Sequence, residues 1–265
     1  MMIAMREWKD AETYHKVSAP QTAWGTEVLE RLTLRGDELV LDVGCGTGKL
    51  TAKLLERLPR GRVLATDLSQ NMLRVAQEHL KPAFGSRAEF ACADAAALPV
   101  SGKADAIFST ATFHWVLDHP RLFRSLHAAL KPGGRLVAQC GGKGNIERLT
   151  RRCAAIEREP AFARYFDGWN GPWEYADADT TASRLEAAGF TDIHTWLQPA
   201  PAVFDDAAAY REFVTNVVCR QHLNRLPDED LRRRFVDLIT EQAAQDAPAF
   251  ELDYLRLNLD ARRGY

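Results

Sequence analysis

A glycine turn and two aspartates are the residues of this chain whose types and spacing best suit the binding of a ligand. Gly44, Gly46 and Gly48 follow an apolar run at 39–43 and form the pattern G-x-G-x-G. Glycine lets the backbone turn sharply and approach a ligand without a Cβ in the way. The helix expected next begins with unpaired N–H groups, which favour the negative end of a ligand. The NAD fingerprint G-x-G-x-x-G/A requires a small residue where this chain has Lys49, so the spacing favours another adenosine-containing ligand.

The two aspartates each follow a predicted strand. Asp67 comes after the run 62–66, where a carboxylate can accept hydrogen bonds from both hydroxyls of a ribose. It can instead cap the next helix, a role that Ser69 fills equally well. Asp94 comes after the run 88–92, where a carboxylate can accept from the exocyclic amine of adenine or simply stabilise a turn.

Alternating strands and helices must position these residues. Helices are predicted at 48–58, 69–80 and 120–130, the last stopping at the sequence Lys-Pro-Gly-Gly. The alternation predicts a parallel, doubly wound α/β sheet, whose ligands bind at the carboxyl ends of the strands. The strands predicted in this part of the chain lie at 39–43, 62–66, 88–92, 104–109 and 135–140.

The pattern is looser after residue 140. Helices are predicted at 145–158 and 179–188, a strand at 191–197, largely helical chain over 205–247 with a break at Leu226-Pro227, and a final strand over 250–259. We expect one domain over residues 1–265. Its core comprises about 36–142, 177–200 and 249–262, and a helical cap over the strand ends comprises about 1–35, 143–176 and 205–247.

Composition excludes several classes of protein. The net charge of −2 gives no support to a nucleic-acid or anionic-membrane partner. The five cysteines have no C-x-x-C spacing, so neither a zinc site nor a disulfide framework is indicated. The chain has no signal-peptide pattern and no run long enough to span a bilayer, so we expect a cytoplasmic protein.

Four motifs, in order and at the expected spacing, resemble the class I S-adenosylmethionine-dependent methyltransferases. They are LDVGCGTG at 41–48, ATDLS at 65–69, ADA at 93–95 and LKPGGRL at 130–136. The resemblance implies a Rossmann-like sheet of seven strands, mostly parallel with the last strand antiparallel. It also implies S-adenosylmethionine as cofactor, S-adenosylhomocysteine as product, and no metal.

The resemblance also implies which residues bind the cofactor. Asp42, Gly44 and Gly46 would border its methionine part. Tyr14 would lie over it as an aromatic lid, or pack in a helix, with Trp8 a weaker candidate. Met72 would flank adenine or ribose, or belong to the core. The full predicted set is Tyr14, Asp42, Gly44, Cys45, Gly46, Asp67, Leu68, Met72, Asp94, Ala95 and Ser109.

The segment FSTATFHWVLDH at 108–119 narrows the class of acceptor. It resembles the segment after the fourth strand in small-molecule methyltransferases of the trans-aconitate, malonyl-carrier-protein and ubiquinone-pathway types. The segment lacks the Asn/Asp-Pro-Pro-Tyr/Phe motif of enzymes that methylate a flipped base, the Pro-Cys of cytosine enzymes, the metal-binding carboxylates of catechol enzymes and the paired glutamates of protein-arginine enzymes. A small organic acceptor is therefore predicted, with the oligomeric state left open.

Methyl transfer depends mainly on holding donor and acceptor together in a pocket with little water. A carboxylate acceptor is already ionised and needs no base, whereas a base helps when the acceptor is a phenol, amine or carbon acid. His114 is the candidate base, or it orients a loop or contacts the cofactor, while His119 is expected to be structural. Candidate acceptor-pocket residues are His114, Trp115, Tyr165, Trp169 and Trp173, whose rings can instead pin an irregular segment.

The predicted function is methyl transfer to a small organic acceptor, with a carboxylate favoured. Arg148, Arg151 and Arg152 are candidates to meet an anionic acceptor, or are solvated helix charges. The alternatives are an N- or C-methyltransferase of secondary metabolism that uses a general base, and a non-catalytic S-adenosylmethionine-binding regulatory protein. An NAD(P)-dependent oxidoreductase is disfavoured by Lys49.

Overall fold

The computed structural model describes residues 19–265, with side chains from residue 22 onward. The predicted lid residue Tyr14 and the weaker candidate Trp8 lie outside the described residues. The chain forms two compact units. The first comprises the described chain up to Lys143 together with 173–198 and 256–265, and the second comprises 144–172 and 199–255.

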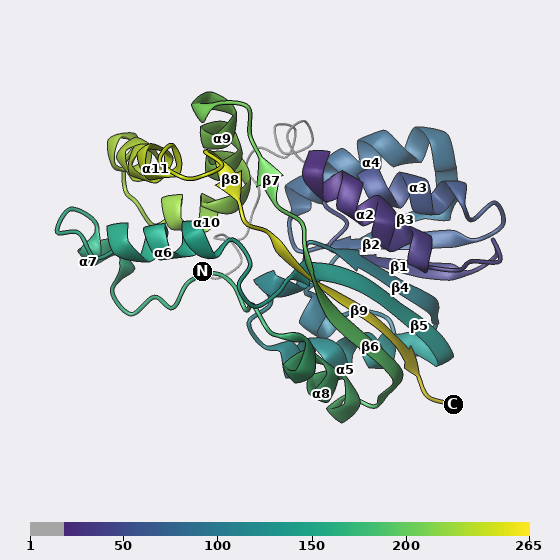
Figure 1. Cartoon of the computed structure of the whole chain (residues 1–265). Coiled ribbons are helices and arrows are strands. Elements are labelled where there is room, and N and C mark those ends of the chain that lie inside the picture. Colours follow the sequence, from purple (N-terminus) through teal and green to yellow (C-terminus); the bar gives the residue numbers. More distant parts are fainter. Residues whose placement is uncertain (1–18) are drawn as a thin grey trace. The chain divides into compact units, whose positions relative to one another are not determined.

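The first unit contains a seven-stranded sheet, drawn in Figure 1 with the strand order β3-β2-β1-β4-β5-β9-β6. The pairs joining β3, β2, β1, β4 and β5 are parallel, and β9 runs antiparallel to β5. The predicted fold class is confirmed, including the antiparallel last strand. The strands are β1 Leu39–Val43, β2 Arg62–Asp67, β3 Ala88–Cys92, β4 Ala104–Thr110, β5 Leu130–Gly141, β6 Phe190–Pro199 and β9 Leu255–Arg263.

Helices cover both faces of this sheet (Figure 1). On one face α2 (Ala19–Arg31), α3 (Lys49–Glu56) and α4 (Gln70–Phe84) bury their apolar residues against β1 and β2. On the other face α5 (His119–Ala129) and α8 (Ala178–Ala187) pack against β4, β5 and β9. Short 3₁₀ helices at Gly85–Arg87, Ala95–Ala97 and Phe113–Trp115 complete the connections.

Two details of this unit differ from the sequence prediction. Residues 1–35 were assigned to the cap, but Val28, Leu29 and Leu32 of α2 are buried with Val40 and other sheet residues, so this helix belongs to the sheet unit. β5 begins at Leu130 rather than 135, because α5 ends at Ala129 and the chain enters the strand at once. A register shift between Ala104 and Ala106 of β4 accompanies this early start.

The second unit is mainly helical around an aromatic core. Phe162 and Phe166 both pack on Phe235, with ring centroids 5.6 and 5.9 Å from it. The predicted final strand over 250–259 is in fact two, β8 and β9, and a short strand β7 that was not predicted pairs with β8. The elements of this unit are α6 Glu147–Ile156, α7 Ala163–Phe166, β7 Ala202–Val203, α9 Ala207–Phe213, a π-helical turn Val214–Val218, α10 Arg220–Leu223, α11 Glu229–Ala243 and β8 Glu251–Leu252.

Candidate functional site

A hollow lies beside the glycine loop, where β1 and β4 end and α3 begins. Four predicted residues, Asp42, Gly44, Cys45 and Gly46, line it. The remaining lining residues were not predicted as ligand contacts: Thr22, Thr47, Lys49, Leu50, Thr110 and Ala111. Their position in the fold could have indicated them as ligand contacts. Each lies at the start of a helix or at the carboxyl end of a central strand, the edge at which open α/β sheets bind ligands.

Glycine is required at position 44 by both conformation and space. Gly44 has a φ of 75°, and its N–H donates to the carbonyl of Thr66 at 2.8 Å. A Cβ at this position would lie 2.0 Å from Oγ1 of Thr112. Even alanine would therefore force the end of β4 away from the loop.

Asp67 ends β2 directly beside the loop. Its two carboxylate oxygens accept from the backbone N–H of Gly46 at 2.9 Å and of Ser69 at 2.8 Å. Ser69, not Asp67, caps α4, since its side chain accepts from the N–H of Met72. This arrangement removes the capping alternative for Asp67 and holds its carboxylate at the sheet edge. A carboxylate has acceptor sites for several hydrogen bonds, which suits the two hydroxyls of a ribose.

Asp42 is a buried carboxyl in the wall of the hollow. It is 3 % exposed, and the hydroxyl of Thr51 donates to its Oδ2 at 2.5 Å. Burial raises its pKa to about 7, and the nearby charge of Asp67 adds to the rise. Asp42 can thus exchange a proton near neutral pH, and a cationic ligand would favour its charged form.

The residues predicted at adenine follow β2 and β3. Asp94 begins the 3₁₀ turn that contains the buried Ala95, and its Oδ1 accepts from the N–H of Ala96 at 2.9 Å. Leu68 is half-buried, while Met72 is only 2 % exposed and is accounted for by core packing. The contacts of these residues with a cofactor stay predictions.

Ser109, also predicted to bind the cofactor, has a packing role in the structure. It is 1 % exposed, and its hydroxyl donates to the carbonyl of Val43 at 2.6 Å, which ties β4 to β1. The next residues, Thr110 and Ala111, line the hollow instead. Ala111 has a φ of 54°, which is a strained conformation for a residue with a side chain. The hydrogen bond that its N–H donates to the carbonyl of Gln139 helps to hold this conformation.

His114 lies in the 3₁₀ turn after β4 and is 7 % exposed. The N–H of Gly141 donates to its Nδ1 at 3.2 Å, so a neutral ring carries its proton on Nε2. Burial lowers the pKa of His114 well below its ordinary value, and the positive charge of Arg256 lowers it further. His114 is therefore a weak base, and its Nε2–H is the group that can donate a hydrogen bond.

His119 holds the turn that carries His114. Nη1 of Arg184 lies 3.0 Å from Nδ1 of His119, and a guanidinium can only donate. The other ring nitrogen, Nε2, therefore donates to the carbonyl of Phe113 at 3.1 Å. This arrangement matches the structural role predicted for His119.

An aromatic cluster surrounds His114 within the first unit. The rings of Trp115 and Tyr175 lie 5.2 and 5.8 Å from the His114 ring, and Trp173 lies 5.9 Å from Trp115. The N–H of Glu174 donates to the carbonyl of His114 at 2.9 Å, which joins this segment to the turn. The structure thus brings together three of the five predicted pocket residues, His114, Trp115 and Trp173.

The other two pocket candidates belong to the second unit. Trp169 packs on Phe166 and His222, with ring centroids 5.4 and 4.8 Å away, and Tyr165 packs against Arg164. These contacts account for both rings as part of the packing of that unit. Their role toward an acceptor stays a prediction.

The three arginines proposed to meet an anionic acceptor each pair with a carboxylate in the second unit. Arg148 pairs with Asp246, Glu251 and Asp253, and Arg152 pairs with Asp246. Arg151 pairs with Glu147 one helical turn away, and its side chain is 75 % exposed. They are better explained as ion pairs of the helical unit than as an anion site.

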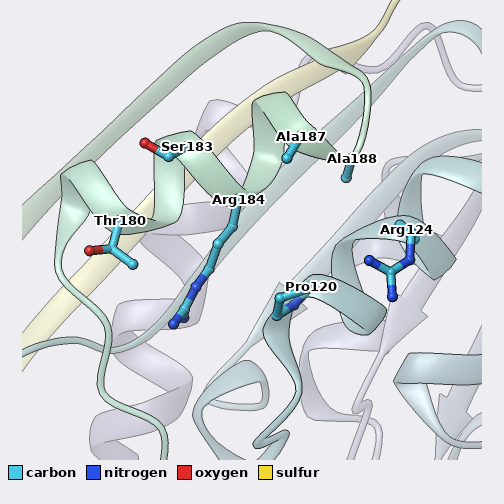
Figure 2. Close-up of a pocket in the computed structure, with 7 residues that line it drawn as sticks. All are labelled: Pro120, Arg124, Thr180, Ser183, Arg184, Ala187 and Ala188. Carbon is cyan, nitrogen blue, oxygen red and sulfur yellow. The ribbon is translucent and has the colours of Figure 1, made fainter.

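A second hollow, of about 360 Å³, lies between α5 and α8 and is drawn in Figure 2. Its lining residues include Pro120 and Arg124 from α5 and Thr180 and Ser183 from α8. None of the predicted cofactor residues lines it. The glycine-loop hollow is therefore the candidate cofactor site.

The residues at the glycine loop fit S-adenosylmethionine. The start of α3 has no side-chain cap, so its first N–H groups suit a carboxylate, while Asp42 suits the cationic methionine part. Asp67 suits the ribose. Among the described residues, no group of three or more His, Cys, Asp or Glu side chains is placed to hold a metal ion.

Comparison with known proteins decides the family. A family model described as a methyltransferase domain matches residues 40–134. A trans-aconitate 2-methyltransferase of Azoarcus sp. is 31 % identical over 85 % of this chain and 85 % of its own. One from Methylobacterium radiotolerans is 31 % identical over 89 % of this chain and 88 % of its own. The chain belongs to the S-adenosylmethionine-dependent methyltransferases. It acts on a small molecule.

Solved structures show the same fold for this methyltransferase. Haemonchus contortus phosphoethanolamine N-methyltransferase 2, in complex with phosphomonomethylethanolamine and S-adenosylhomocysteine, matches 98 % of the chain at 18 % identity with a TM-score of 0.62. The chain spans 60 % of that protein's length. A Bacillus halodurans putative methyltransferase matches 92 % of the chain and 100 % of its own, with 17 % identity and a TM-score of 0.62. Among the described residues, no helix is long and apolar enough to cross a membrane.

Proposed function

We propose that this methyltransferase esterifies one carboxylate of a small unsaturated polycarboxylic acid, using S-adenosylmethionine as methyl donor. The relatives reported above are named trans-aconitate 2-methyltransferases, and their similarity extends over most of the chain. Trans-aconitate is therefore the first acceptor to test. Small di- and tricarboxylic acids of similar shape follow.

The observation that carries the proposal is the environment of His114. Burial and neighbouring positive charge lower its pKa well below the ordinary value, and Nδ1 already accepts from Gly141. Such a ring cannot efficiently remove a proton from an amine, a phenol or a carbon acid. It can donate from Nε2 to an acceptor that arrives ionised, which at neutral pH describes a carboxylate.

The reaction on a carboxylate needs no proton transfer. An oxygen lone pair forms the new O–CH₃ bond while the S–CH₃ bond breaks, and its electron pair returns to the sulfur. S-adenosylmethionine supplies the activated methyl group. The chain's own part is to bind and orient: Asp67 and the glycine loop hold the donor, and the aromatic cluster at His114 excludes water from the acceptor.

An assay of the purified protein tests this function. It is incubated with S-adenosylmethionine and, separately, with trans-aconitate, with smaller carboxylic acids, with amines and with phenols. S-adenosylhomocysteine release and the mass of the methylated product are measured. The proposal predicts a methyl ester from polycarboxylic acids. Turnover of amines or phenols, without turnover of carboxylic acids, would reject it.

A further inference from the structure

Arg256 is a buried cation near His114 that no sequence motif indicated. It belongs to β9, whose residues Leu257 and Leu259 are buried against the apolar core. Arg256 is itself only 3 % exposed and lies opposite Gly141 in the antiparallel β5–β9 pair. Gly141 is the residue whose N–H donates to His114.

The guanidinium of Arg256 also faces the helix that borders the cofactor hollow. Its Cζ lies 4.9 Å from the ring centroid of Trp24 in α2. Two residues earlier in that helix, Thr22 lines the hollow together with the glycine loop. Arg256 is thus close enough to His114 for its charge to lower the pKa of that ring, and it also contacts the helix that supplies Thr22 to the cofactor hollow.

The sheet face that carries Arg256 continues as a row of polar side chains. Gln139 and Asn258 are register partners two residues further along β5 and β9, and both are buried. Nε2 of Gln139 donates to Oδ1 of Asn258 at 3.0 Å. Oε1 of Gln139 is buried and has no hydrogen-bond partner among the described residues, as expected beside a site that receives a polar ligand.

We propose that Arg256 binds a carboxylate of the acceptor other than the one that is methylated, and so selects polycarboxylic over monocarboxylic acids. A guanidinium presents paired N–H donors that match the two oxygens of a carboxylate. Its attraction for that anion is strong because little water reaches a buried site. His114 Nε2–H supplies a second donor nearby. This inference rests on the proposed function and assigns the binding of the acceptor's second carboxylate to Arg256.

The test compares two acceptors in three variants. Trans-aconitate is the polycarboxylic probe and crotonate, an unsaturated monocarboxylic acid, is the reference. Arg256→Gln removes the charge and Arg256→Lys keeps it without the planar fork. Arg262→Gln, near the outer end of the same strand with its side chain 40 % exposed, is the matched control. The affinity for S-adenosylhomocysteine, measured by calorimetry, reports on folding and on the cofactor site.

We expect Arg256→Gln to lower kcat/KM for trans-aconitate about 100-fold, the loss typical of removing a charged, paired hydrogen bond. We expect crotonate turnover and S-adenosylhomocysteine affinity to change less than about threefold. Arg256→Lys should show a loss of about tenfold on trans-aconitate alone. Arg262→Gln should behave as the wild type.

Two outcomes would overturn the inference. One is an unchanged preference for trans-aconitate over crotonate in either Arg256 variant, whether both activities are kept or both fall equally, and the Lys variant decides this if the Gln variant does not fold. The other is a loss of S-adenosylhomocysteine affinity, which would place Arg256 at the cofactor. Wild-type activity on trans-aconitate separates these outcomes from failure of the proposed function, since no carboxylate turnover by the wild type would reject both the proposed function and the inference.

Discussion

Asp42 illustrates how one residue links the cofactor site to stability. Its carboxyl is buried beside Asp67 and has a pKa of about 7, against 3.8 for an ordinary aspartate. Its pKa is thus higher in the folded than in the unfolded state. The contribution of the neutral carboxyl to the free energy of unfolding is therefore complete below pH 3.8 and is lost as the pH rises through 7. At pH 8 the ionised carboxylate costs about 4 kcal/mol.

We therefore predict that Asp42→Asn stabilises the ligand-free protein at pH 8 by up to about 4 kcal/mol and by much less at pH 5. The same variant should bind S-adenosylmethionine at least about tenfold more weakly, because the cationic ligand loses its carboxylate. Urea unfolding at both pH values and calorimetry measure the two effects. Asp37→Asn, at a side chain 51 % exposed, is the control and should show neither. If Asp42→Asn were less stable than the wild type at pH 8, the surroundings of Asp42 would have to stabilise its charged form enough to offset the cost of burial.

His114 makes a second prediction at this scale. Its lowered pKa keeps the ring neutral through the whole of the physiological pH range. With cofactor and acceptor both saturating, kcat should show no step near pH 6.5. A rise of kcat through that pH in the wild type, absent in His114→Gln, would establish that His114 takes a proton and would contradict a carboxylate acceptor.

At the scale of the element, the glycine loop depends on both a left-handed conformation and an absence of side chain. Gly44 and Gly102 both have positive φ, 75° and 60°. A Cβ at Gly44 would lie 2.0 Å from Thr112, whereas a Cβ at Gly102 would have nothing within 4 Å. The two positions therefore separate backbone strain from crowding.

We predict that Gly102→Ala costs about 1 kcal/mol of unfolding free energy and leaves cofactor affinity unchanged. Gly44→Ala should cost about 3 kcal/mol or more and abolish measurable S-adenosylhomocysteine binding, because the end of β4 must shift. Thermal unfolding and calorimetry on the pair provide the comparison. Equal behaviour of the two variants would mean that the loop tolerates the added side chain.

The sheet and the glycine loop could be predicted because their signals are local. Apolar runs marked β1 to β4, and the loop follows β1 directly. Ser109 stays a predicted cofactor contact, but its hydrogen bond to Val43 could not be predicted, because that bond joins distant parts of the chain. The short strand β7 depends on pairing with β8 in the same way. Arg256 could be noticed as a charge in an apolar strand, but its neighbours His114 and Trp24 appear only when the chain is folded.

At the scale of the whole molecule, buried histidines make the fold sensitive to acid. His222 of the second unit is 2 % exposed, and burial lowers its pKa from 6.5 to about 3. Because its folded-state pKa is lowered, the stability it contributes is present above pH 6.5 and is lost as the pH falls toward 3. Between pH 7.5 and 5 this loss is about 2 kcal/mol.

We predict that His222→Gln is less stable than the wild type at pH 7.5 but loses about 2 kcal/mol less on transfer to pH 5. Urea unfolding followed by circular dichroism at the two pH values measures the difference. Asn224, an exposed residue of the same unit whose amide does not titrate, is the comparison site, where a Gln variant should keep the wild-type pH dependence. An identical pH dependence in His222→Gln would show that the His222 ring is already protonated in the folded protein.

The central claim is that this methyltransferase forms a carboxylate ester. The most direct measurement uses S-adenosylmethionine labelled with ¹³C in its methyl group, incubated with the protein and trans-aconitate and followed by NMR. The account predicts that the label appears as an O-methyl ester, in step with S-adenosylhomocysteine, and that mild base removes it. Label on nitrogen or carbon with other acceptors, and none on trans-aconitate or related acids, would contradict the account.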